Sequence, residues 1–359
     1  MFGLYIHIPF CKSKCAYCDF YSLGRKDYVP DNYIDSIINQ IKLFCFNREN
    51  IIFDTIYFGG GTPSLLNDSQ ITNILNNINY KTNAEITIEV NPETVNLEKL
   101  KSFYACGINR ISVGVQTASD ENLKILSRRH NSQKSIECLS NCHKAGFTNI
   151  SGDIMLSLPN YSFKECLNTI KLLSDNGCVH ISSYLLKIEK NTRFYTHPPL
   201  GIPDEDLSAD FYLYCVDKLK EYNYNQYEIS NFAKDNFASK HNLIYWNCEN
   251  YLGIGPSAHS CVDDERFYYN SNINEFINNP SIIKDGKCTT EDYIMLQLRL
   301  NSGLNLNKLK EKYNFVFTKE NIDFIRKCEK NKLCTYFNDI LTLTPNGMLI
   351  QNQILNNLI

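Results

Sequence analysis

The stretch Leu4-Tyr5-Ile6-His7-Ile8-Pro9-Phe10-Cys11-Lys12-Ser13-Lys14-Cys15-Ala16-Tyr17-Cys18-Asp19-Phe20 decides how this chain folds and what it binds. Its first half is an apolar run of strand length, and its second half places three cysteines at the spacing C-x3-C-x2-C. Thiolates are soft ligands that suit iron–sulfur clusters or zinc. Structural zinc sites and ferredoxin clusters use four protein ligands, so three thiolates leave one coordination position open. We therefore expect a metal centre on Cys11, Cys15 and Cys18 that accepts an exchangeable ligand.

The composition narrows the class of protein. The chain has 359 residues and a formal net charge of −3, with 36 Lys and Arg against 39 Asp and Glu. No run of basic residues appears, so nucleic acid is not an expected partner. No secretory signal and no apolar stretch of membrane-spanning length is visible, and the 15 cysteines form an odd number. We therefore expect a cytoplasmic protein with free thiols and metal ligands instead of disulfides.

Apolar runs alternate with segments of helical periodicity through most of the chain. Six runs are predicted to be strands: residues 4–8, 51–58, 85–90, 110–115, 150–156 and 179–185. Six segments are predicted to be helices: residues 33–46, 70–78, 97–106, 132–145, 163–174 and 207–222. This alternation requires crossover connections and favours a mainly parallel sheet covered by helices. The predicted fold class is α/β, a partial barrel of six βα units, fewer than the eight of a closed barrel.

The alternation ends near residue 222, which divides the chain into three predicted regions. Residues 1–223 would form the partial barrel, and residues 224–285 a connecting subregion that contains a glycine-rich turn at 253–256. Residues 286–359 show short helical patterns followed by a hairpin over 333–343. Helices followed by such a wing predict a mainly helical, winged-helix-like domain. Because this domain shows no basic recognition face, we expect a structural or docking role.

The cysteine triplet and its neighbours, Tyr5-x-His7-x-Pro9-Phe10-Cys11-x3-Cys15-x-Tyr17-Cys18, resemble the radical S-adenosylmethionine (radical SAM) superfamily. Within it, essentially the whole chain is similar to the group that contains oxygen-independent coproporphyrinogen III oxidase and the haem chaperone HemW. The resemblance implies that the three cysteines hold a [4Fe-4S] cluster whose fourth iron is chelated by S-adenosyl-L-methionine (SAM). In that superfamily an electron from the cluster cleaves SAM, so the cofactors supply the difficult chemistry.

Further candidate residues follow the ends of the predicted strands, where the active sites of βα barrels gather. The resemblance implies that Gly60, Gly61 and Thr62, in a GGGTP-like motif, bind the methionine amino group of SAM, and glycines let backbone approach a ligand closely. It assigns further SAM contacts to Tyr5, Tyr17, Glu89, Gln116, Arg128 and Asp153. Arginine suits the methionine carboxylate, and a carboxylate can accept hydrogen bonds from ribose hydroxyls. Taken singly, the polar residues Glu89, Gln116, Arg128 and Asp153 are equally well explained as structural or solvated side chains, but their order on successive strand ends favours SAM binding.

Three features favour HemW over the oxidase. First, the oxidase has a further cysteine two residues after the third, and this chain has Phe20 at that position. Second, the oxidase has an N-terminal extension before the cluster strand, whereas only Met1–Leu4 precede Tyr5 here. The segment His241-Asn242-x-x-Tyr245-Trp246 matches the HNxxYW motif of HemW proteins, whose histidine is associated with haem binding. Imidazole is a common axial ligand of haem iron, so the resemblance implies a haem site that includes His241. The alternative for His241 is a turn histidine that is hydrogen-bonded to backbone.

The expected function is that of a HemW-type haem chaperone, which binds haem, a [4Fe-4S] cluster and SAM and passes haem to acceptor haemoproteins. Respiratory, membrane-associated haemoproteins are candidate acceptors, and the chain would be a monomer or a homodimer. One alternative is an oxygen-independent coproporphyrinogen III oxidase, which decarboxylates propionates to vinyl groups. The other is a structural zinc-binding interaction protein. Cys138 and Cys142, four residues apart in a predicted helix, are expected to be packing residues and not a second metal site.

Overall fold

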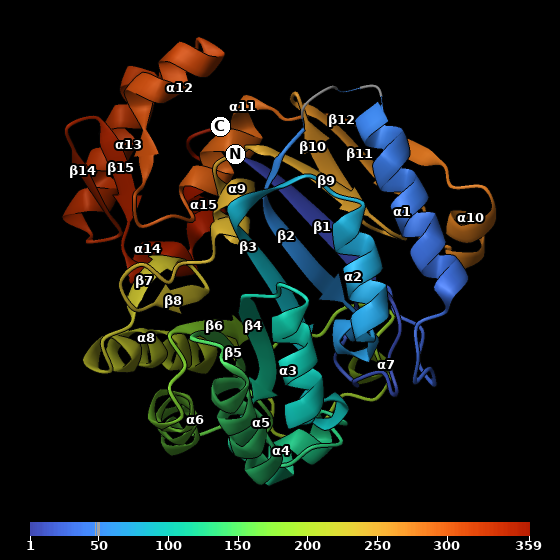
Figure 1. Ribbon diagram of the computed structural model, residues 1–359. Helices are drawn as coiled ribbons and strands as arrows, with labels where there is room; N and C mark the ends of the chain where they lie inside the picture. The colour runs from blue at the N-terminus through green and yellow to red at the C-terminus, as the bar shows by residue number, and fades with distance from the viewer. Residues whose placement is uncertain (47, 49–50) are drawn as a thin grey trace.

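The computed structural model describes residues 1–46, 48 and 51–359, and its main body is a twelve-stranded sheet (Figure 1). The strand order is β12-β11-β10-β9-β1-β2-β3-β4-β5-β6-β8-β7. The six central strands are parallel and follow chain order: β1 (Phe2–Ile8), β2 (Phe53–Gly60), β3 (Tyr80–Val90), β4 (Arg110–Gln116), β5 (Asn149–Leu156) and β6 (His180–Leu185). They correspond to the six predicted strands, so the predicted parallel α/β arrangement is confirmed.

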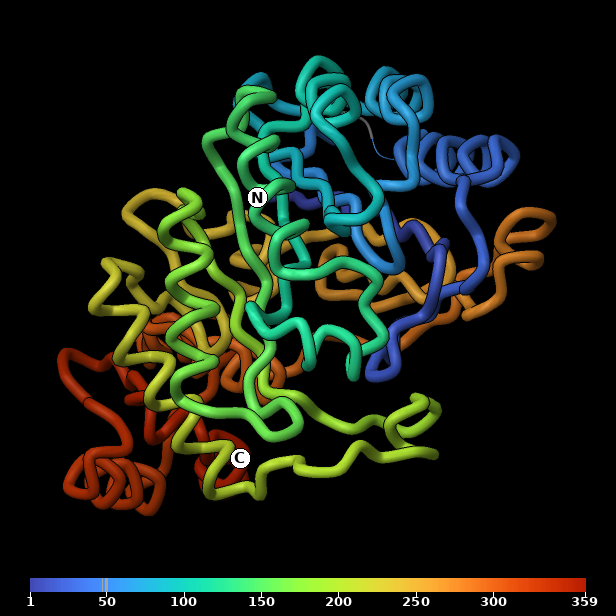
Figure 2. The backbone as a smooth tube through the Cα atoms, turned by 90° about the horizontal axis from the view of Figure 1, so that it is seen from below, coloured from blue at the N-terminus to red at the C-terminus, as the bar shows by residue number. Residues whose placement is uncertain are grey.

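Helices connect these strands and cover one face of the sheet. In Figure 1, α1, α2 and α3 lie in front of β1 to β4, and Figure 2 shows the same helices along one side of the backbone. The helices of this part are α1 (Asp31–Phe46), α2 (Asp68–Asn76), α3 (Leu97–Ala105), α4 (Asp120–Ile125), α5 (Ser132–Ala145), α6 (Phe163–Asp175), α7 (Arg193–Thr196) and α8 (Glu205–Glu221). The six predicted helices are confirmed, and the short α4 and α7 were not predicted. Polar side chains cap the N-termini of several of these helices. At α2, for example, Asn67 and Gln70 form a capping box.

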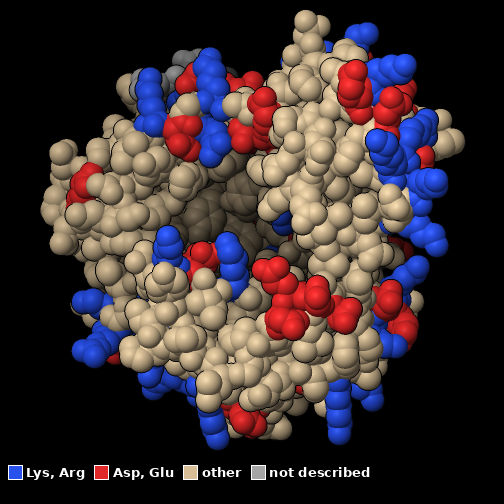
Figure 3. All heavy atoms as spheres, turned by 180° about the vertical axis from the view of Figure 1, so that it is seen from behind, with Lys and Arg blue, Asp and Glu red and all other residues tan. Residues whose placement is uncertain are grey.

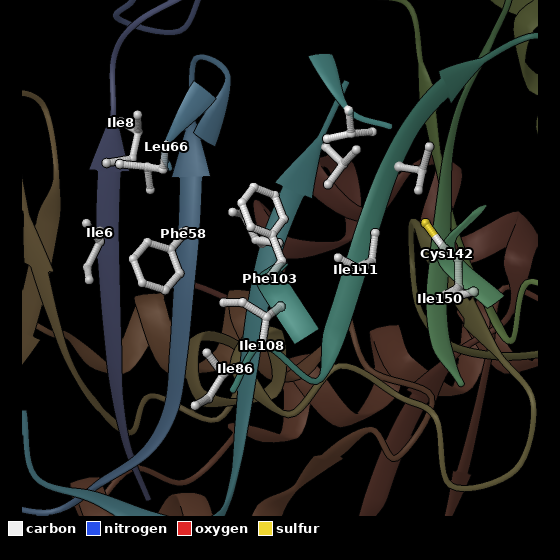
Figure 4. Close-up of a cluster of buried hydrophobic side chains, with 14 of the residues drawn as sticks. Ile6, Ile8, Phe58, Leu66, Ile86, Phe103, Ile108, Ile111, Cys142 and Ile150 are labelled. Carbon is white, nitrogen blue, oxygen red and sulfur yellow. The ribbon is translucent and has the colours of Figure 1, made fainter. Parts of the chain in front are cut away.

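Apolar side chains fill the space between the sheet and its helices. Figure 4 shows Ile6, Phe58 and Ile111 on their strands beside Phe103 and Cys142 from the covering helices. All five side chains are buried. Burial of a large apolar side chain contributes roughly 1.5–3 kcal/mol, so this layer stabilises the sheet that carries the site. Cys142 lies in this core as a small apolar residue, as predicted.

Residues 224–285 extend both edges of the same sheet. β7 (Asn225–Glu228) and β8 (Asn231–Ala233) lie beyond β6, while β9 (Asn250–Ile254), β10 (His259–Val262), β11 (Glu265–Tyr269) and β12 (Ile282–Lys287) lie beyond β1. The helices of this region are α9 (Lys240–Trp246) and α10 (Ile273–Asn278). The glycine-rich segment begins inside β9 and not in a turn. A Cβ at Gly253 would lie 2.1 Å from the carbonyl oxygen of His259, so only glycine allows this close approach.

The C-terminal region has a hydrophobic core of its own. Its elements are α11 (Thr290–Gln297), β13 (Leu304–Asn305), α12 (Leu306–Tyr313), α13 (Lys319–Lys330), β14 (Cys334–Phe337), β15 (Ile340–Leu343), α14 (Pro345–Leu349) and α15 (Gln351–Leu355). The predicted hairpin is confirmed by the antiparallel pairing of β14 with β15. An ion pair of 3.0 Å between Arg299 and the fully buried Glu228 connects this region to β7. Among the described residues, no helix is long and apolar enough to cross a membrane.

Candidate functional site

A cavity of about 430 Å³ lies at the carboxyl ends of the parallel strands. The face of the molecule opposite to the view of Figure 1 is visibly hollowed near its centre (Figure 3). Parallel strands bring their carboxyl ends to one side of a sheet, so polar residues from different strands meet there. The predicted site residues that line the cavity are Cys11, Cys15, Tyr17, Cys18, Gly60, Gly61, Thr62, Glu89, Gln116, Arg128 and Asp153. The volume is in the range of cavities that bind small molecules and cofactors.

The three cysteines lie on the loop between β1 and α1, at one wall of the cavity. Two donors from other elements approach their sulfurs: Thr62 Oγ1 lies 3.4 Å from Cys11 Sγ, and Arg128 Nη1 lies 3.5 Å from Cys15 Sγ. Hydrogen bonds to sulfur stabilise thiolates and tune metal centres that thiolates hold. Soft sulfur ligands with such donors around them fit an iron–sulfur cluster.

Two of these thiols hold their protons more tightly than an ordinary cysteine does. Burial raises the pKa of Cys11, and it raises the pKa of Cys18 to about 11. Such thiols become ligands when a cationic centre displaces their protons, so the binding of a cationic centre releases protons.

Within residues 1–46, 48 and 51–359, no group of three or more His, Cys, Asp or Glu side chains is placed to hold a single metal ion.

The glycine segment after β2 lies directly against the cysteine loop. Gly60 has φ +113°, a conformation that favours glycine. A Cβ at Gly61 would lie 2.9 Å from the carbonyl oxygen of Ile8 and 3.0 Å from Cys11 Sγ. The absence of side chains here therefore lets the backbone of this segment line the cavity while it touches the cysteine loop.

Two carboxyl groups face the cavity from β3 and β5. Glu89 accepts hydrogen bonds from the Tyr57 hydroxyl at 3.0 Å and from the Gly60 N–H at 3.1 Å. Asp153 accepts a hydrogen bond of 3.0 Å from the Ser112 hydroxyl. Burial, followed by the charge of Asp153, raises the pKa of Glu89 to about 7, and burial also raises the pKa of Asp153. The wall thus presents hydrogen-bond acceptors, and the charge of one of them, Glu89, depends on pH near neutrality.

Arg110, at the start of β4, also lines the cavity, and the sequence pattern did not single it out. Its side chain is only 2% exposed and its Nε has no hydrogen-bond partner. Its positive charge opposes the upward pKa shifts of Glu89 and Asp153. The sequence did contain a signal for Arg110, since it is a charged residue at the start of the apolar run 110–115. Arginine is rarely buried without a partner, so its presence in a buried strand indicates a role.

Arg128 and Gln116 shape the end of β4. Arg128 donates through Nη2 to the carbonyl oxygen of Gly114 at 2.7 Å, in addition to its contact with Cys15. Gln116 has φ +69° and stands at an irregularity in the pairing of β4 with β5. A positive φ at a non-glycine residue stores backbone strain and occurs often at functional sites.

Tyr5 and His241 are the two predicted site residues that do not line the cavity. Tyr5 stacks on Tyr57 with ring centroids 6.1 Å apart, and its hydroxyl lies 3.0 Å from His7 Nδ1. His241 stacks on Tyr57 at 5.1 Å. Both residues therefore lie behind a cavity-lining aromatic ring.

His241 is 1% exposed, and both of its ring nitrogens have partners. Nδ1 lies 2.7 Å from Thr55 Oγ1, and Nε2 lies 2.6 Å from the Tyr245 hydroxyl. Burial, followed by the charge of Arg110, lowers the pKa of His241 to about 3, so the imidazole is neutral. The motif forms helix α9 and not a turn, and the carboxylate of Glu85 accepts the N–H of His241 at 3.0 Å at its start.

The site and fold agree with the similarity of the chain to known proteins. Residues 5–173 match the radical SAM superfamily. A protein of Buchnera aphidicola subsp. Schizaphis graminum named Heme chaperone HemW is 35% identical, across 95% of this chain and 97% of its own. Heme chaperone HemW of Bacillus subtilis is 30% identical, across 99% and 98%. The structure of coproporphyrinogen III oxidase (HemN) from Escherichia coli, a radical SAM enzyme, has a TM-score of 0.84 and 21% identity, across 99% of this chain and 89% of that chain. The last similarity concerns the fold, and it agrees with the predicted partial barrel.

Proposed function

Because the chain belongs to the radical SAM superfamily and, within it, to the family of the haem chaperone HemW, we propose that it binds haem and delivers it to acceptor haemoproteins. The observation that carries the proposal is the contact between the HNxxYW helix and the cavity wall. His241 of α9 stacks on Tyr57, and the Tyr57 hydroxyl donates to Glu89 in the cavity. A displacement of His241 on α9 would therefore alter the packing of Tyr57 and its hydrogen bond to Glu89, beside the expected cofactors.

The superfamily implies a [4Fe-4S] cluster and SAM, and we assign the cluster to Cys11, Cys15 and Cys18. When bound, these cofactors supply electron transfer and the radical chemistry of SAM. The residues assigned to SAM are Tyr17, Gly60, Gly61, Thr62, Glu89, Gln116, Arg128 and Asp153. Arg128 would hold the methionine carboxylate, and Glu89 would accept hydrogen bonds from ribose hydroxyls. Tyr5, which lies behind the wall, would act by supporting Tyr57.

For haem, we assign His241 as the iron ligand. Neutral imidazole is the form that binds iron. To reach iron, the ring must give up its hydrogen bond to Tyr245 or to Thr55 and leave its position behind Tyr57. Haem binding would therefore displace α9, a helix of seven residues, from the sheet.

A haem titration of the cluster-loaded chain tests this function. The absorption of bound haem would be followed for the wild type, His241→Ala and the control His197→Ala, which removes an exposed histidine. We expect saturable binding by the wild type and the control, and its loss in His241→Ala. Tyr245→Phe keeps the imidazole but releases Nε2, so it should bind haem more tightly. Wild-type affinity in His241→Ala would reject His241 as ligand, and no saturable binding by any chain would reject the chaperone function.

Two alternatives are separated by parallel assays. The first alternative is the oxidase function, because the chain shares the fold of coproporphyrinogen III oxidase. Against it, Phe20, which is 62% exposed, lines the cavity at the position where the oxidase has a cysteine. Formation of protoporphyrinogen from coproporphyrinogen III with SAM and a reductant would contradict the chaperone function. A visible cluster absorption after anaerobic reconstitution would reject the structural zinc alternative.

A further inference from the structure

The inner part of the cavity holds a positive charge without an ionic partner among the described residues. Arg110 lines the cavity, although its side chain is only 2% exposed. Its Nε has no hydrogen-bond partner, and no described carboxylate lies within the ion-pair distance of 4.0 Å from its guanidinium. Arg299, by contrast, pairs with the buried Glu228 at 3.0 Å. Because a buried charge without a partner is costly, the isolated guanidinium indicates that the cavity takes an anionic ligand.

The two carboxyl groups of the cavity wall are held by donors other than Arg110. Asp153 accepts a hydrogen bond of 3.0 Å from the Ser112 hydroxyl. Glu89 accepts hydrogen bonds from the Tyr57 hydroxyl at 3.0 Å and from a backbone N–H at 3.1 Å. The guanidinium of Arg110 therefore remains available to a ligand.

Two further polar side chains can complete a site around Arg110. Thr87 is its register partner on β3, and the buried Thr87 hydroxyl has no hydrogen-bond partner. Asn242, the second residue of the HNxxYW segment, lines the same cavity. Guanidinium, hydroxyl and amide donors together suit a carboxylate, which accepts several hydrogen bonds at once. A doubly charged phosphate suits the site less well, because Glu89 and Asp153 line the same cavity.

Arg110 is far from the residue assigned to the carboxylate of SAM. Arg128 contacts Cys15 and donates to the carbonyl oxygen of Gly114. Arg110 begins the same strand, four residues before Gly114, which is roughly 13 Å at the usual rise of a strand. The methionine carboxylate is the anionic group of SAM, so a ligand carboxylate at Arg110 belongs to another molecule.

Arg110 lies on the side of the cavity that faces α9. Tyr57, Thr87 and Arg110 are successive register partners on β2, β3 and β4. The backbones of Tyr57 and Arg110 are therefore two strand spacings apart, about 10 Å. His241 of α9 stacks on Tyr57 with ring centroids 5.1 Å apart. The assigned iron ligand and the guanidinium thus lie at the scale of a single haem, which carries two propionate carboxylates at the edge of its ring.

We propose that Arg110 binds a carboxylate of the ligand, with Thr87 and Asn242 as further donors, and that this carboxylate is a propionate of haem. The inference rests on the haem binding proposed above and names the group of haem that the cavity recognises. The guanidinium would donate paired hydrogen bonds to the propionate and neutralise its charge. The chain would therefore prefer haem with free propionates to haem whose propionates are esterified.

Haem and haem dimethyl ester are the matched probes of this site. Each is titrated into the cluster-loaded chain and followed by absorption. We expect the wild type to bind haem roughly tenfold more tightly than the ester, because the ester cannot form charge-assisted hydrogen bonds. Arg110→Gln should abolish this preference, and Arg326→Gln, which changes an arginine exposed at 56%, should keep it. Equal affinity of the wild type for both probes would overturn the proposal, and this measurement needs no variant to fold.

A titration of SAM identifies the source of the carboxylate. We expect Arg110→Gln to keep the wild-type affinity for SAM while it loses affinity for haem. A loss of SAM affinity with unchanged haem affinity would assign Arg110 to the carboxylate of SAM and overturn the propionate assignment.

Sodium propionate tests the carboxylate site without haem. At constant ionic strength, propionate in place of chloride should raise the midpoint of thermal unfolding of the wild type but not of Arg110→Gln, because a ligand of the folded state stabilises it. A rise in a wild-type chain that binds no haem would reject the chaperone function and haem as the ligand, but would keep the carboxylate site. Neither a rise nor haem binding would reject both the site and the function.

Discussion

The guanidinium of Arg128 lies with one nitrogen 3.5 Å from the sulfur of Cys15 and with the other 2.7 Å from the carbonyl oxygen of Gly114. One side chain therefore joins the cysteine loop to the end of β4, and its Nε remains without a protein partner. A planar guanidinium can donate hydrogen bonds to a sulfur, a backbone carbonyl and a carboxylate at the same time, which an ammonium group in this position cannot.

Arg128→Lys is expected to weaken SAM binding by at least about tenfold, because lysine cannot keep both protein contacts and hold a carboxylate. The measurement is calorimetric titration of SAM into the cluster-loaded chain. Arg129→Lys is the control, since its side chain is 59% exposed and pairs with Glu93 at the surface. Equal SAM affinity in wild type and Arg128→Lys would contradict the assigned role.

Gly61→Ala is expected to reduce cluster incorporation. The added Cβ would lie 2.9 Å from the Ile8 carbonyl oxygen and 3.0 Å from Cys11 Sγ, so the cysteine loop must shift. Such overpacking costs roughly 1–3 kcal/mol. Iron content after anaerobic reconstitution measures the effect. At Gly24 a Cβ has its nearest neighbour at 3.6 Å, so Gly24→Ala should load normally; equal loading of both variants would be evidence against the contact.

Glu89→Gln is expected to stabilise the chain at high pH. The pKa of Glu89 is raised from 4.5 to about 7, so the folded chain holds this proton more tightly than the unfolded chain does. The stabilising effect of the proton is complete below pH 4.5 and is lost as the pH rises to about 7, a change of up to roughly 3 kcal/mol. The free energy of unfolding in urea, measured at several pH values, should therefore show a gain for Glu89→Gln that grows across this window. A gain that is the same at pH 4.5 and pH 8 would rule out this pKa.

Arg299→Met is expected to destabilise the chain by about 3–5 kcal/mol, because it leaves the buried carboxylate of Glu228 without its cation. Arg326→Met breaks an exposed pair with Glu329 and should cost less than about 1 kcal/mol. Urea unfolding compares the two variants. A loss for Arg299→Met as small as that for Arg326→Met would show that the ion pair does not hold the C-terminal region to β7.

The central strands and helices could be predicted because their patterns are local. Buried parallel strands appear as short apolar runs, as in residues 110–115, and helices repeat apolar residues every three or four positions. The sequence pattern did not predict most of the strands from β7 to β12. They are short, they alternate with polar and aromatic residues, and their pairing partners are set by the strands of the barrel.

The sequence by itself determined the cysteine triplet, the order of βα units and the strand ends that carry Gly61, Glu89 and Asp153, because spacing and periodicity are properties of neighbouring residues. Only the tertiary structure decided that Arg110 faces the cavity and that His241 is buried behind Tyr57. Each of these results depends on packing between elements far apart in the chain. No local pattern records which distant side chains such packing brings into contact or removes from solvent.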